Sequence, residues 1–348
     1  MKVLSLFDGM SCAQIALTRI GVDFKYYASE VDKYAIKVTQ ANFPSTVQLG
    51  DIKQIKGGDY DLIIGGSPCQ GFSFAGKQLN FQDPRSALFF EYVRVLRENK
   101  DCFFLLENVR MKKEHQDVIS DLLGVQPIMI NSSLVSAQNR VRLYWTNIPG
   151  VEQPEDKGIT WGDVREYSVN EECFYYTEKA MQWLARVSQK KCKTLTVHED
   201  ADKMQMIEAS HHKKYSNQRF FGIVDLPSMD SSIAAMRGRY LVHKSVKDGK
   251  KPTCQYIEFR YDGKSNAITT VSKDNIVVPF TLPNKVPASD FFFRYITPLE
   301  CERLQTVDDG YTGHASNTQR YKMLGNGFTV DVIKHILRGL LRSNSTKH

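Results

Sequence analysis

Short apolar runs that alternate with helical patterns are the feature that most restricts how this chain can fold. Five strand-like runs stand in the first 150 residues, at 3–7, 24–29, 62–64, 102–106 and 141–145. Between them, apolar residues recur at the spacing of a helix. Such alternation is typical of a parallel sheet covered by helices on both faces. We therefore expect an α/β fold that binds its ligands at the carboxyl ends of the strands.

A cysteine follows one of these runs, in the stretch DLIIGGSPCQGFSFAG of residues 61–76. Gly65 and Gly66 allow backbone angles and close approaches that other residues resist. Pro68 fixes its own φ and favours an extended residue before it. Cys69 is therefore expected at the ligand-binding edge of the sheet. Its position alone also fits the commoner role of a free cysteine, a small packed side chain.

Two other expected strand ends carry charged side chains. Glu107 and Asn108 close the run CFFLLENV, where desolvation favours the protonated form of a carboxyl group. Arg140 and Arg142 are two residues apart and so lie on one face of a strand. If this segment stood alone, the two arginines would be interpreted as an ordinary solvent-exposed pair without a functional role. Together with Cys69, these ends offer a nucleophile, a proton donor and a fixed cation.

The N-terminal stretch LSLFDGMSCAQIAL predicts a strand, a glycine turn and a helix. Glu30 ends the next strand, where an acidic residue binds ribose hydroxyls in nucleotide-binding folds. Asp32 has the position of a helix cap, and Asp51 ends a third strand. The stretch lacks the Gly-x-Gly-x-x-Gly pattern, which counts against a dinucleotide-dependent oxidoreductase.

Composition excludes several classes of protein. The chain has 348 residues, a net charge of +7 and seven cysteines without Cys-x-x-Cys spacing. This argues against a disulfide framework and a structural metal site. The N-terminal apolar run is too short for a signal peptide, and no run approaches the ~18 apolar residues of a membrane span. We expect a cytoplasmic protein with no metal and no membrane association.

Several stretches together resemble the DNA cytosine-5 methyltransferase family of bacteria and phages. SLFDGMSC resembles its first cofactor motif, GGSPCQGFS its Pro-Cys nucleophile loop, LLENV its glutamate motif and QNRVR its paired-arginine motif. Near the other end, RYITPLECERLQ and MLGNGFTVDV resemble its last two motifs. The motifs occur in the family's order, in residues 1–150 and about 290–340.

The resemblance implies the family's organisation. Residues 1–150 would form a catalytic and cofactor-binding domain with the Rossmann-like sheet of class I S-adenosylmethionine-dependent methyltransferases. Residues 151–290 would form a smaller inserted target recognition domain. Residues 291–348 would return to the catalytic domain.

The resemblance also implies the reaction. A cytosine is flipped out of double-stranded DNA, because a base inside the duplex cannot reach the pocket. Cys69 attacks C6, Glu107 in its protonated form donates to N3, Arg142 holds O2 and Arg140 orients the loop. The methyl group comes from S-adenosylmethionine. The base that removes the C5 proton is not assigned.

The resemblance assigns the cofactor pocket to Phe7, Asp8, Gly9, Glu30, Val31, Asp51, Ile52, Pro68, Asn326 and Gly327. Glu30 would accept hydrogen bonds from the ribose hydroxyls, and Asp51 would accept one from the adenine amino group. The chain departs from the family pattern at Ser11 and Cys12, which replace common glycines, and at Val31, where an aromatic residue is frequent.

Recognition of DNA falls on basic and aromatic stretches of residues 151–290 and on the nucleophile loop. The segment KSNAITT looks like the Thr-rich core of many recognition domains. The residues expected to contact DNA are Gln70, Ser73, Arg237, Arg239, Arg260, Thr269 and Thr270. The target sequence cannot be read from these residues.

Alternatives to a DNA methyltransferase remain at this stage. A family member that methylates tRNA would keep the same catalytic residues. A non-catalytic DNA-binding member would not need them, so intact Cys69, Glu107, Arg140 and Arg142 count against it. The expected partners are double-stranded DNA and, for a restriction–modification enzyme, a restriction endonuclease that acts separately. We expect a monomer, from a bacterium or a phage-infected host.

Overall fold

The computed structural model describes residues 1–68, 87–166, 169, 231–240, 253–259, 265–266, 276–279 and 296–345. Six of the predicted site residues lie outside this set: Cys69, Gln70, Ser73, Arg260, Thr269 and Thr270. Arg237 and Arg239 lie in a strand whose backbone alone is described.

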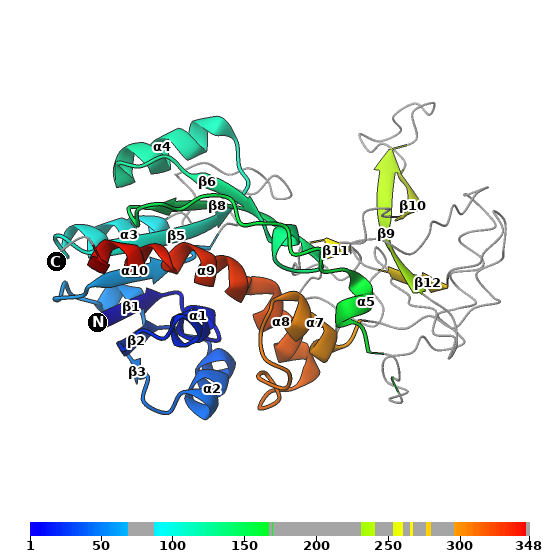
Figure 1. Cartoon of the computed structure of the whole chain (residues 1–348), viewed down its shortest axis with the longest axis horizontal. Coiled ribbons are helices and arrows are strands. Elements are labelled where there is room, and N and C mark those ends of the chain that lie inside the picture. The colour runs from blue at the N-terminus through cyan, green and yellow to red at the C-terminus, as the bar shows by residue number, and fades with distance from the viewer. Residues whose placement is uncertain are drawn as a thin grey trace, which may run out of the picture.

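A seven-stranded sheet lies between helices in the left half of Figure 1. Its strands are β1 (Lys2–Leu6), β2 (Lys25–Ser29), β3 (Val47–Gln48), β4 (Leu62–Gly65), β5 (Phe103–Val109), β6 (Ile128–Asn131) and β8 (Val141–Thr146). They lie in the order β3-β2-β1-β4-β5-β8-β6. The predicted runs all form strands, and β5 continues three residues beyond its predicted end at 106.

The strands from β3 to β5 are parallel, as predicted, but β8 runs antiparallel to both β5 and β6. The prediction of an all-parallel sheet is therefore wrong at residues 141–146. The reason is the short connection between β6, which ends at Asn131, and β8, which begins at Val141. A parallel neighbour needs a crossover of a dozen or more residues, whereas adjacent antiparallel strands need only a short loop.

Helices cover both faces of the sheet (Figure 1). The helices are α1 (Cys12–Ile20), α2 (Lys33–Asn42), α3 (Ala87–Arg97), α4 (Lys113–Leu123), α5 (Trp161–Val164), α7 (Pro298–Leu304), α8 (Asn317–Asn326), α9 (Val330–Leu337) and α10 (Gly339–Ser345), with 3₁₀ turns η1 (Ile52–Gln54) and η2 (Ser132–Leu134). Alternate residues of β1 show the two-sided burial. Val3 belongs to one apolar core and Leu4 to the other, and both are fully buried.

Each core joins different helices to the sheet. Val3 shares its core with α1 and with α9, so residues near both ends of the chain pack together. Leu4 shares its core with Phe89 and Tyr92 of α3, which are fully buried as the helical spacing predicted. Burial of each such aromatic or branched side chain contributes about 1.5–3 kcal/mol to the free energy of unfolding. These contacts therefore hold α3 against the sheet.

Four short strands are described in the inserted region. β9 (Ser231–Tyr240) lies between β10 (Thr253–Phe259) and β12 (Ile276–Pro279) in an antiparallel sheet. β11 (Ser265–Asn266) pairs in parallel with β7 (Gln138–Asn139), directly before Arg140. The domain boundaries at 150 and 290 stay predictions. Within the part of the chain that is described, no helix is long and apolar enough to cross a membrane.

Candidate active site

The predicted site lies where the order of the strands reverses. β1 continues the sheet through β2 on one side and through β4 on the other, and Leu6 pairs with Gly65 at their carboxyl ends. The loops that follow these two residues therefore leave the sheet side by side. In open α/β sheets, such a reversal is the place where ligands bind.

Gly65 is the last residue of β4 and Gly66 follows it, and neighbouring side chains crowd both glycines. An added Cβ on Gly65 would come within 2.9 Å of the Tyr92 ring, and one on Gly66 within 2.8 Å of the Phe328 ring. Neither glycine has a positive φ in the structure. Their role is therefore close approach, and the left-handed backbone that glycine also permits is not used here.

The segment that leads to Cys69 is attached to β5. Ser67 is buried, and its hydroxyl and carbonyl oxygens accept hydrogen bonds from the Asn108 amide at 3.2 and 3.5 Å. The side-chain oxygen of Asn108, Oδ1, accepts a hydrogen bond from the Val109 N–H at 2.8 Å, which fixes the orientation of the side-chain amide. Pro68 follows and is half-buried. The nucleophile loop therefore starts from a fixed point on the sheet.

Glu107 and Arg142 form an ion pair beside this point. Arg142 Nε lies 2.9 Å from Glu107 Oε1, and each side chain is 11% exposed. The contact lacks the alignment of a hydrogen bond. Glu107 lies inside β5, opposite Tyr144 of β8, and its carboxyl group faces a cation. The prediction of a carboxyl group at a strand end in apolar surroundings is therefore wrong in both respects.

Arg140 is directed to a different partner from Arg142. It lies between β7 and β8 and is 3% exposed. Its guanidinium donates to the Gly325 carbonyl at 3.3 Å and to the Gly327 carbonyl at 3.0 Å. Arg140 thereby holds the backbone at the end of α8, on either side of the exposed Asn326. The two predicted cofactor residues at 326 and 327 are thus joined to the paired-arginine segment.

Glu30 is held by backbone groups at the carboxyl end of β2. Its Oε2 accepts the Gly9 N–H at 2.8 Å, and its Oε1 accepts the N–H groups of Val31 and Asp32 at 2.7 and 2.8 Å. Val31 is 72% exposed beside it. A carboxylate fixed next to an exposed apolar side chain suits a nucleoside, which presents a diol and a flat ring.

Asp51 and Ile52 differ in accessibility. Asp51 is exposed and caps η1 by accepting the Lys53 N–H at 3.0 Å. Ile52 is 3% exposed and belongs to the core beneath the sheet edge. Of the two predicted apolar contacts Val31 and Ile52, Val31 alone therefore presents an open surface. The predicted cap of α2 is present, because Asp32 accepts the Tyr34 N–H at 2.9 Å.

Phe7 and Asp8 follow β1 in a tight turn. Phe7 has a φ of +57° and is half-buried. The Asp8 side chain is 7% exposed and accepts hydrogen bonds from the hydroxyls of Tyr26 and Ser11. Asp8 therefore lies beneath the turn, where it contacts other side chains of the protein. One signal for this network was present in the sequence, the replacement of a common family glycine by Ser11, whereas nothing pointed to Tyr26.

Three cysteines whose side chains are described, Cys12, Cys102 and Cys301, are buried free thiols. Cys12 lies against Gly327, whose added Cβ would be 3.1 Å from the sulfur. Burial raises the pKa of Cys12 to about 12, and the nearby Asp8 acts in the same direction. Burial also raises the pKa values of Cys102 and Cys301. These three thiols are poor nucleophiles, because only the thiolate form reacts readily.

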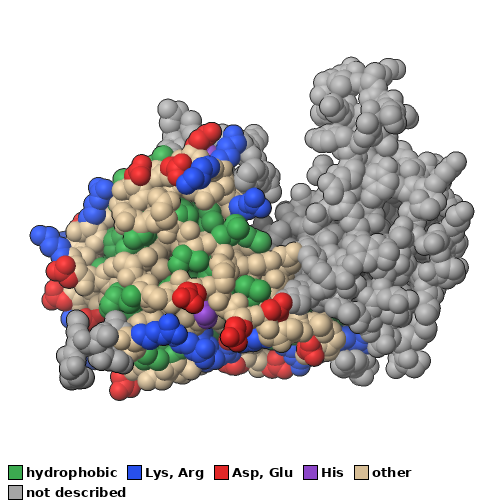
Figure 2. Space-filling view, turned by 45° about the horizontal axis from the view of Figure 1, so that its top comes forward, with side chains coloured by type: hydrophobic (Ala, Val, Ile, Leu, Met, Phe, Trp, Pro, Cys, Tyr) green, Lys and Arg blue, Asp and Glu red, His purple; other side chains and the backbone are tan. Residues whose placement is uncertain are grey.

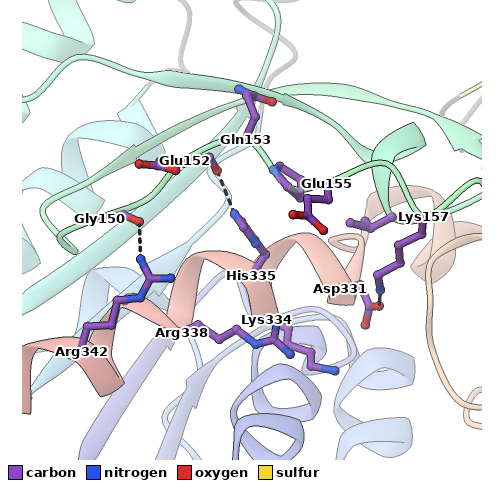
Figure 3. Close-up of a pocket in the computed structure, with 13 residues that line it drawn as sticks. Gly150, Glu152, Gln153, Glu155, Lys157, Asp331, Lys334, His335, Arg338 and Arg342 are labelled. Carbon is purple, nitrogen blue, oxygen red and sulfur yellow. Dashed lines mark hydrogen bonds and ion pairs between the residues drawn. The ribbon is translucent and has the colours of Figure 1, made fainter. Parts of the chain in front are cut away.

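A polar cavity of about 390 Å³ lies elsewhere, between residues 150–157 and helices α9 and α10 (Figure 3). His335 Nε2 contacts the Glu152 carbonyl at 2.8 Å, and Lys157 pairs with Asp331 at 2.6 Å. On the face drawn in Figure 2, basic and acidic side chains stand next to one another. None of the predicted site residues lines this cavity, and its mixed charge suits a junction that fixes α9.

The sheet order with one antiparallel strand, and the ligand groups at the β1/β4 reversal, define a class I S-adenosylmethionine-dependent methyltransferase. The family model of the C-5 cytosine-specific DNA methylases matches residues 1–342, so the chain belongs to this family. It is therefore an enzyme that transfers a methyl group from S-adenosylmethionine to C5 of cytosine in DNA.

Curated relatives extend over the whole chain. The type II methyltransferase M.BanI of Aneurinibacillus aneurinilyticus is 27% identical in an alignment that covers 99% of this chain and 96% of that protein. The orphan methyltransferase M.SPRI of Bacillus phage SPR is 27% identical in an alignment that covers 100% of this chain and 99% of that protein.

Solved structures show the same fold. The Entamoeba histolytica methyltransferase EhMeth has a TM-score of 0.68 at 16% identity, covering 99% of this chain and 98% of its own. A Spodoptera frugiperda DNMT2 mutant has a TM-score of 0.62 at 20% identity, covering 98% and 99%.

Proposed function

We propose that this chain methylates cytosine within one specific double-stranded DNA sequence, and that Cys69 adds covalently to C6 of the flipped-out base. The observation that supports this most is the attachment of Ser67 to Asn108, next to the ion pair of Glu107 and Arg142. It supports a nucleophile loop that starts beside Glu107 and Arg142, the proposed acid and cation. Cys69 itself lies beyond the described residues, two positions further along the chain.

The residue types suit the chemistry of cytosine. Carbon C5 is a poor nucleophile until the Cys69 thiolate forms a bond to C6, which turns the ring into an enamine. Negative charge then develops at N3 and O2. Glu107 would donate a proton to N3, and Arg142 would stabilise O2. After C5 is methylated, a base removes the C5 proton and the Cys69–C6 bond breaks, which restores the thiolate, and N3 returns its proton to Glu107.

The neighbouring cation affects how Glu107 would work. The Arg142 guanidinium occupies one carboxylate oxygen, Oε1, whereas Oε2 lies toward Gly66 at the carboxyl end of β4. We infer that Oε2 is the oxygen that faces the base. Arg142 would then serve both as the partner of Glu107 and as the donor to O2, which its several N–H groups permit.

The cofactor site is assigned to the edge formed by β1, β2 and η1. S-adenosylmethionine supplies an electrophilic methyl group when bound. Glu30 would accept the ribose hydroxyls, Asp51 would accept the adenine amine, and Val31 would cover the adenine ring. The exposed positions of Asp51 and Val31 and the fixed carboxylate of Glu30 support this assignment.

Sequence recognition is assigned to residues 151–290 together with Gln70 and Ser73 of the nucleophile loop. Arg237 and Arg239 lie in β9, the central strand of the inserted sheet, and we propose that they contact DNA. Arg260, Thr269 and Thr270 are proposed to do the same. We further propose a monomer in the cytoplasm of a bacterium or a phage-infected host, acting alone or beside a cognate restriction endonuclease.

A duplex that carries 5-fluorocytosine tests the covalent mechanism. Fluorine cannot leave C5 as a cation, so the enzyme should stay bonded to the methylated base. We expect a protein–DNA complex that survives denaturing electrophoresis, requires S-adenosylmethionine and maps to Cys69. The Cys69→Ser variant should form none while still binding DNA. Bisulfite sequencing of DNA from cells that express the chain should give the target sequence for the duplex.

Two results would contradict the proposal. A link to Cys12 or Cys102 would move the nucleophile to another residue. A folded protein that binds the cofactor but forms no complex with the fluorinated duplex would exclude the covalent DNA mechanism. Complex formation with a fluorinated tRNA alone would assign the substrate to RNA.

A further inference from the structure

The turn between β1 and α1 has an unusual backbone. Phe7, Gly9 and Ser11 have φ values of +57°, +61° and +60°. The left-handed region is easily reached by glycine but costs other residues about 1 kcal/mol or more. Ser11 stands at the N-cap of α1, yet its hydroxyl makes no cap hydrogen bond. The Tyr311 hydroxyl donates to the Met10 carbonyl at 2.7 Å and the Ser11 N–H donates to the Asp8 carbonyl at 3.2 Å, and a buried side-chain interaction adds to these bonds.

That interaction centres on Asp8. Its Oδ1 accepts the Tyr26 hydroxyl at 2.7 Å, and its Oδ2 accepts the Ser11 hydroxyl. Thr39 of α2 donates to the Ser11 hydroxyl oxygen at 3.1 Å. All four side chains are buried, with Ser11 and Thr39 fully so. On its buried side, the turn is therefore bound to β2 through Tyr26 and to α2 through Thr39.

The backbone of the same turn is also hydrogen-bonded to Glu30. The Gly9 N–H, one residue after Asp8, donates to Glu30 Oε2 at 2.8 Å. The Asp8 N–H donates to the Ser29 carbonyl at 3.1 Å, one residue before Glu30. A displacement of Asp8 would therefore move the N–H group that orients the Glu30 carboxylate.

We propose that Asp8 is a positioning residue for S-adenosylmethionine: its ionised carboxylate, bound by the Ser11 and Tyr26 hydroxyls, holds the Gly9 N–H against Glu30 and so presents Glu30 to the ribose hydroxyls. The proposal rests on the assignment of Glu30 to the cofactor site. It also explains why a serine stands at position 11: the serine hydroxyl donates a hydrogen bond to Asp8, which a glycine could not do.

The protonation state of Asp8 makes this arrangement sensitive to pH. Burial raises the pKa of Asp8 to about 6, although hydrogen bonds from Ser11 and Tyr26 oppose the shift. Glu30 at the end of β2 raises it further. Cys12 of α1 and Tyr311 also face Asp8, and burial keeps both of them protonated across the range in question by raising their pKa values.

Protonation removes one of the two acceptors that the hydroxyl groups need. Tyr26 stays protonated, because burial raises its pKa well above 10, so it continues to require an acceptor. The Ser11 hydroxyl can then keep its contact only by accepting the new Asp8 proton in place of donating its own, so the hydrogen bonds that hold the turn have to rearrange. With a pKa near 6, roughly one tenth of Asp8 is ionised at pH 5, so the apparent cofactor affinity should fall about tenfold between pH 7.5 and pH 5.

Calorimetric titration with S-adenosylmethionine over this pH range tests the proposal on the full-length chain. We expect Asp8→Asn to bind weakly, with little further change between pH 5 and 7.5. The ratio of wild-type to Asp8→Asn affinity cancels the titration of the ligand. Ser11→Ala and Tyr26→Phe should each weaken binding several-fold at pH 7.5. Tyr27→Phe, which removes a hydroxyl from the next residue of β2, should not.

Stability separates positioning from simple support of the fold. Asp8→Asn removes a buried charge, so its thermal midpoint at pH 7.5 should equal or exceed that of the wild type while its affinity is lower. Equal affinity of the two proteins at every pH would overturn the proposal, and so would a loss of affinity that follows a loss of folding. A folded wild type that binds no S-adenosylmethionine at any pH would overturn the cofactor site itself.

Discussion

Asn108 of β5 holds Ser67, the residue two positions before Cys69, through hydrogen bonds to both its hydroxyl and its carbonyl oxygen. Both residues are buried, so water cannot replace these bonds. The reactive loop is therefore attached to the strand that carries Glu107. One amide side chain thus sets the relative position of the nucleophile loop and the acid.

The Asn108→Ala variant should lose turnover by about 10–100-fold, because a small misplacement of reacting groups has such an effect. Binding of S-adenosylmethionine should change little. Loss of the buried partner should also lower the free energy of unfolding by about 1–3 kcal/mol. Single-turnover methylation and urea unfolding measure the two effects.

Asn99 supplies a matched control for this experiment. It is 5% exposed, donates to the Val95 carbonyl and accepts the Gly58 N–H, and contacts none of the predicted site residues. Asn99→Ala should lose comparable stability and keep its turnover. Equal losses of turnover in both variants would mean that Asn108 acts through stability alone.

The Gly66→Ala variant should lose turnover because the new methyl group meets Phe328 at 2.8 Å and Glu107 Oε2 at 3.3 Å. Overpacking of this kind costs about 1–3 kcal/mol and displaces neighbouring groups. The second substitution Phe328→Leu should restore part of the activity by making room. Gly162→Ala is the control, since its methyl group would have an ordinary contact of 3.6 Å. Failure of Phe328→Leu to rescue would point to the displacement of Glu107.

The Glu107→Gln variant tests the acid. Glutamine can donate a hydrogen bond but cannot deliver a proton, so we expect a turnover loss of about 10²–10⁴-fold. Affinity for S-adenosylmethionine should be nearly unchanged. Glu98→Gln, which breaks a solvent-exposed ion pair with Arg94, serves as the control and should be fully active. Near-normal turnover of Glu107→Gln would show that the carboxylate only fixes Arg142.

Asp8 should make the folded state less stable as pH rises. Its pKa is raised from 3.8 to about 6 on folding, so the folded state binds the proton more tightly than the unfolded chain. The free energy of unfolding should fall between about pH 4 and pH 6 and then level off, by ~3 kcal/mol in all. Of this, about 1 kcal/mol falls between pH 5 and 7.5.

Urea unfolding of the wild type and Asp8→Asn at pH 5 and pH 7.5 measures this contribution. The difference between the two proteins isolates Asp8 from the other titrating groups. The wild type should lose about 1 kcal/mol more than the variant on going to pH 7.5. The opposite sign would mean that Asp8 is ionised throughout and stabilised by its hydroxyl partners.

Hydrophobic patterning was enough to predict β1, β2, β4, β5 and β8 and the edge where the site lies, but it did not predict β6. The apolar run at 62–64 and the motif GGSPCQ placed the nucleophile loop after β4, and the structure has Gly65 and Gly66 there. The direction of β8 was not predicted, because apolar residues alone do not specify the partner of a strand. The length of the connection from β6 carried that information.

Side-chain partners were less accessible from sequence. Glu107 was expected in apolar surroundings because its own strand is apolar, but the neighbouring strand β8 brings Arg142 to it. Asp8 was expected to face the cofactor because it stands in a cofactor motif. The positive φ values of Phe7 and Ser11 turn its side chain inward, and no local pattern predicts a left-handed serine.

The packing of α9 on α1 has a consequence for how the enzyme is made. Val3 and Ile333 share one core, so a ribosome has to synthesise nearly the whole chain before that core can close. Until α9 emerges, the partner face of β1 is open, and domains generally fold only as complete units during synthesis. Arg140 likewise has no Gly325 or Gly327 to hold until then. A nascent chain that stops before α9 therefore lacks both the closed core and the backbone that Arg140 holds, and we expect it to be inactive until α9 has been made.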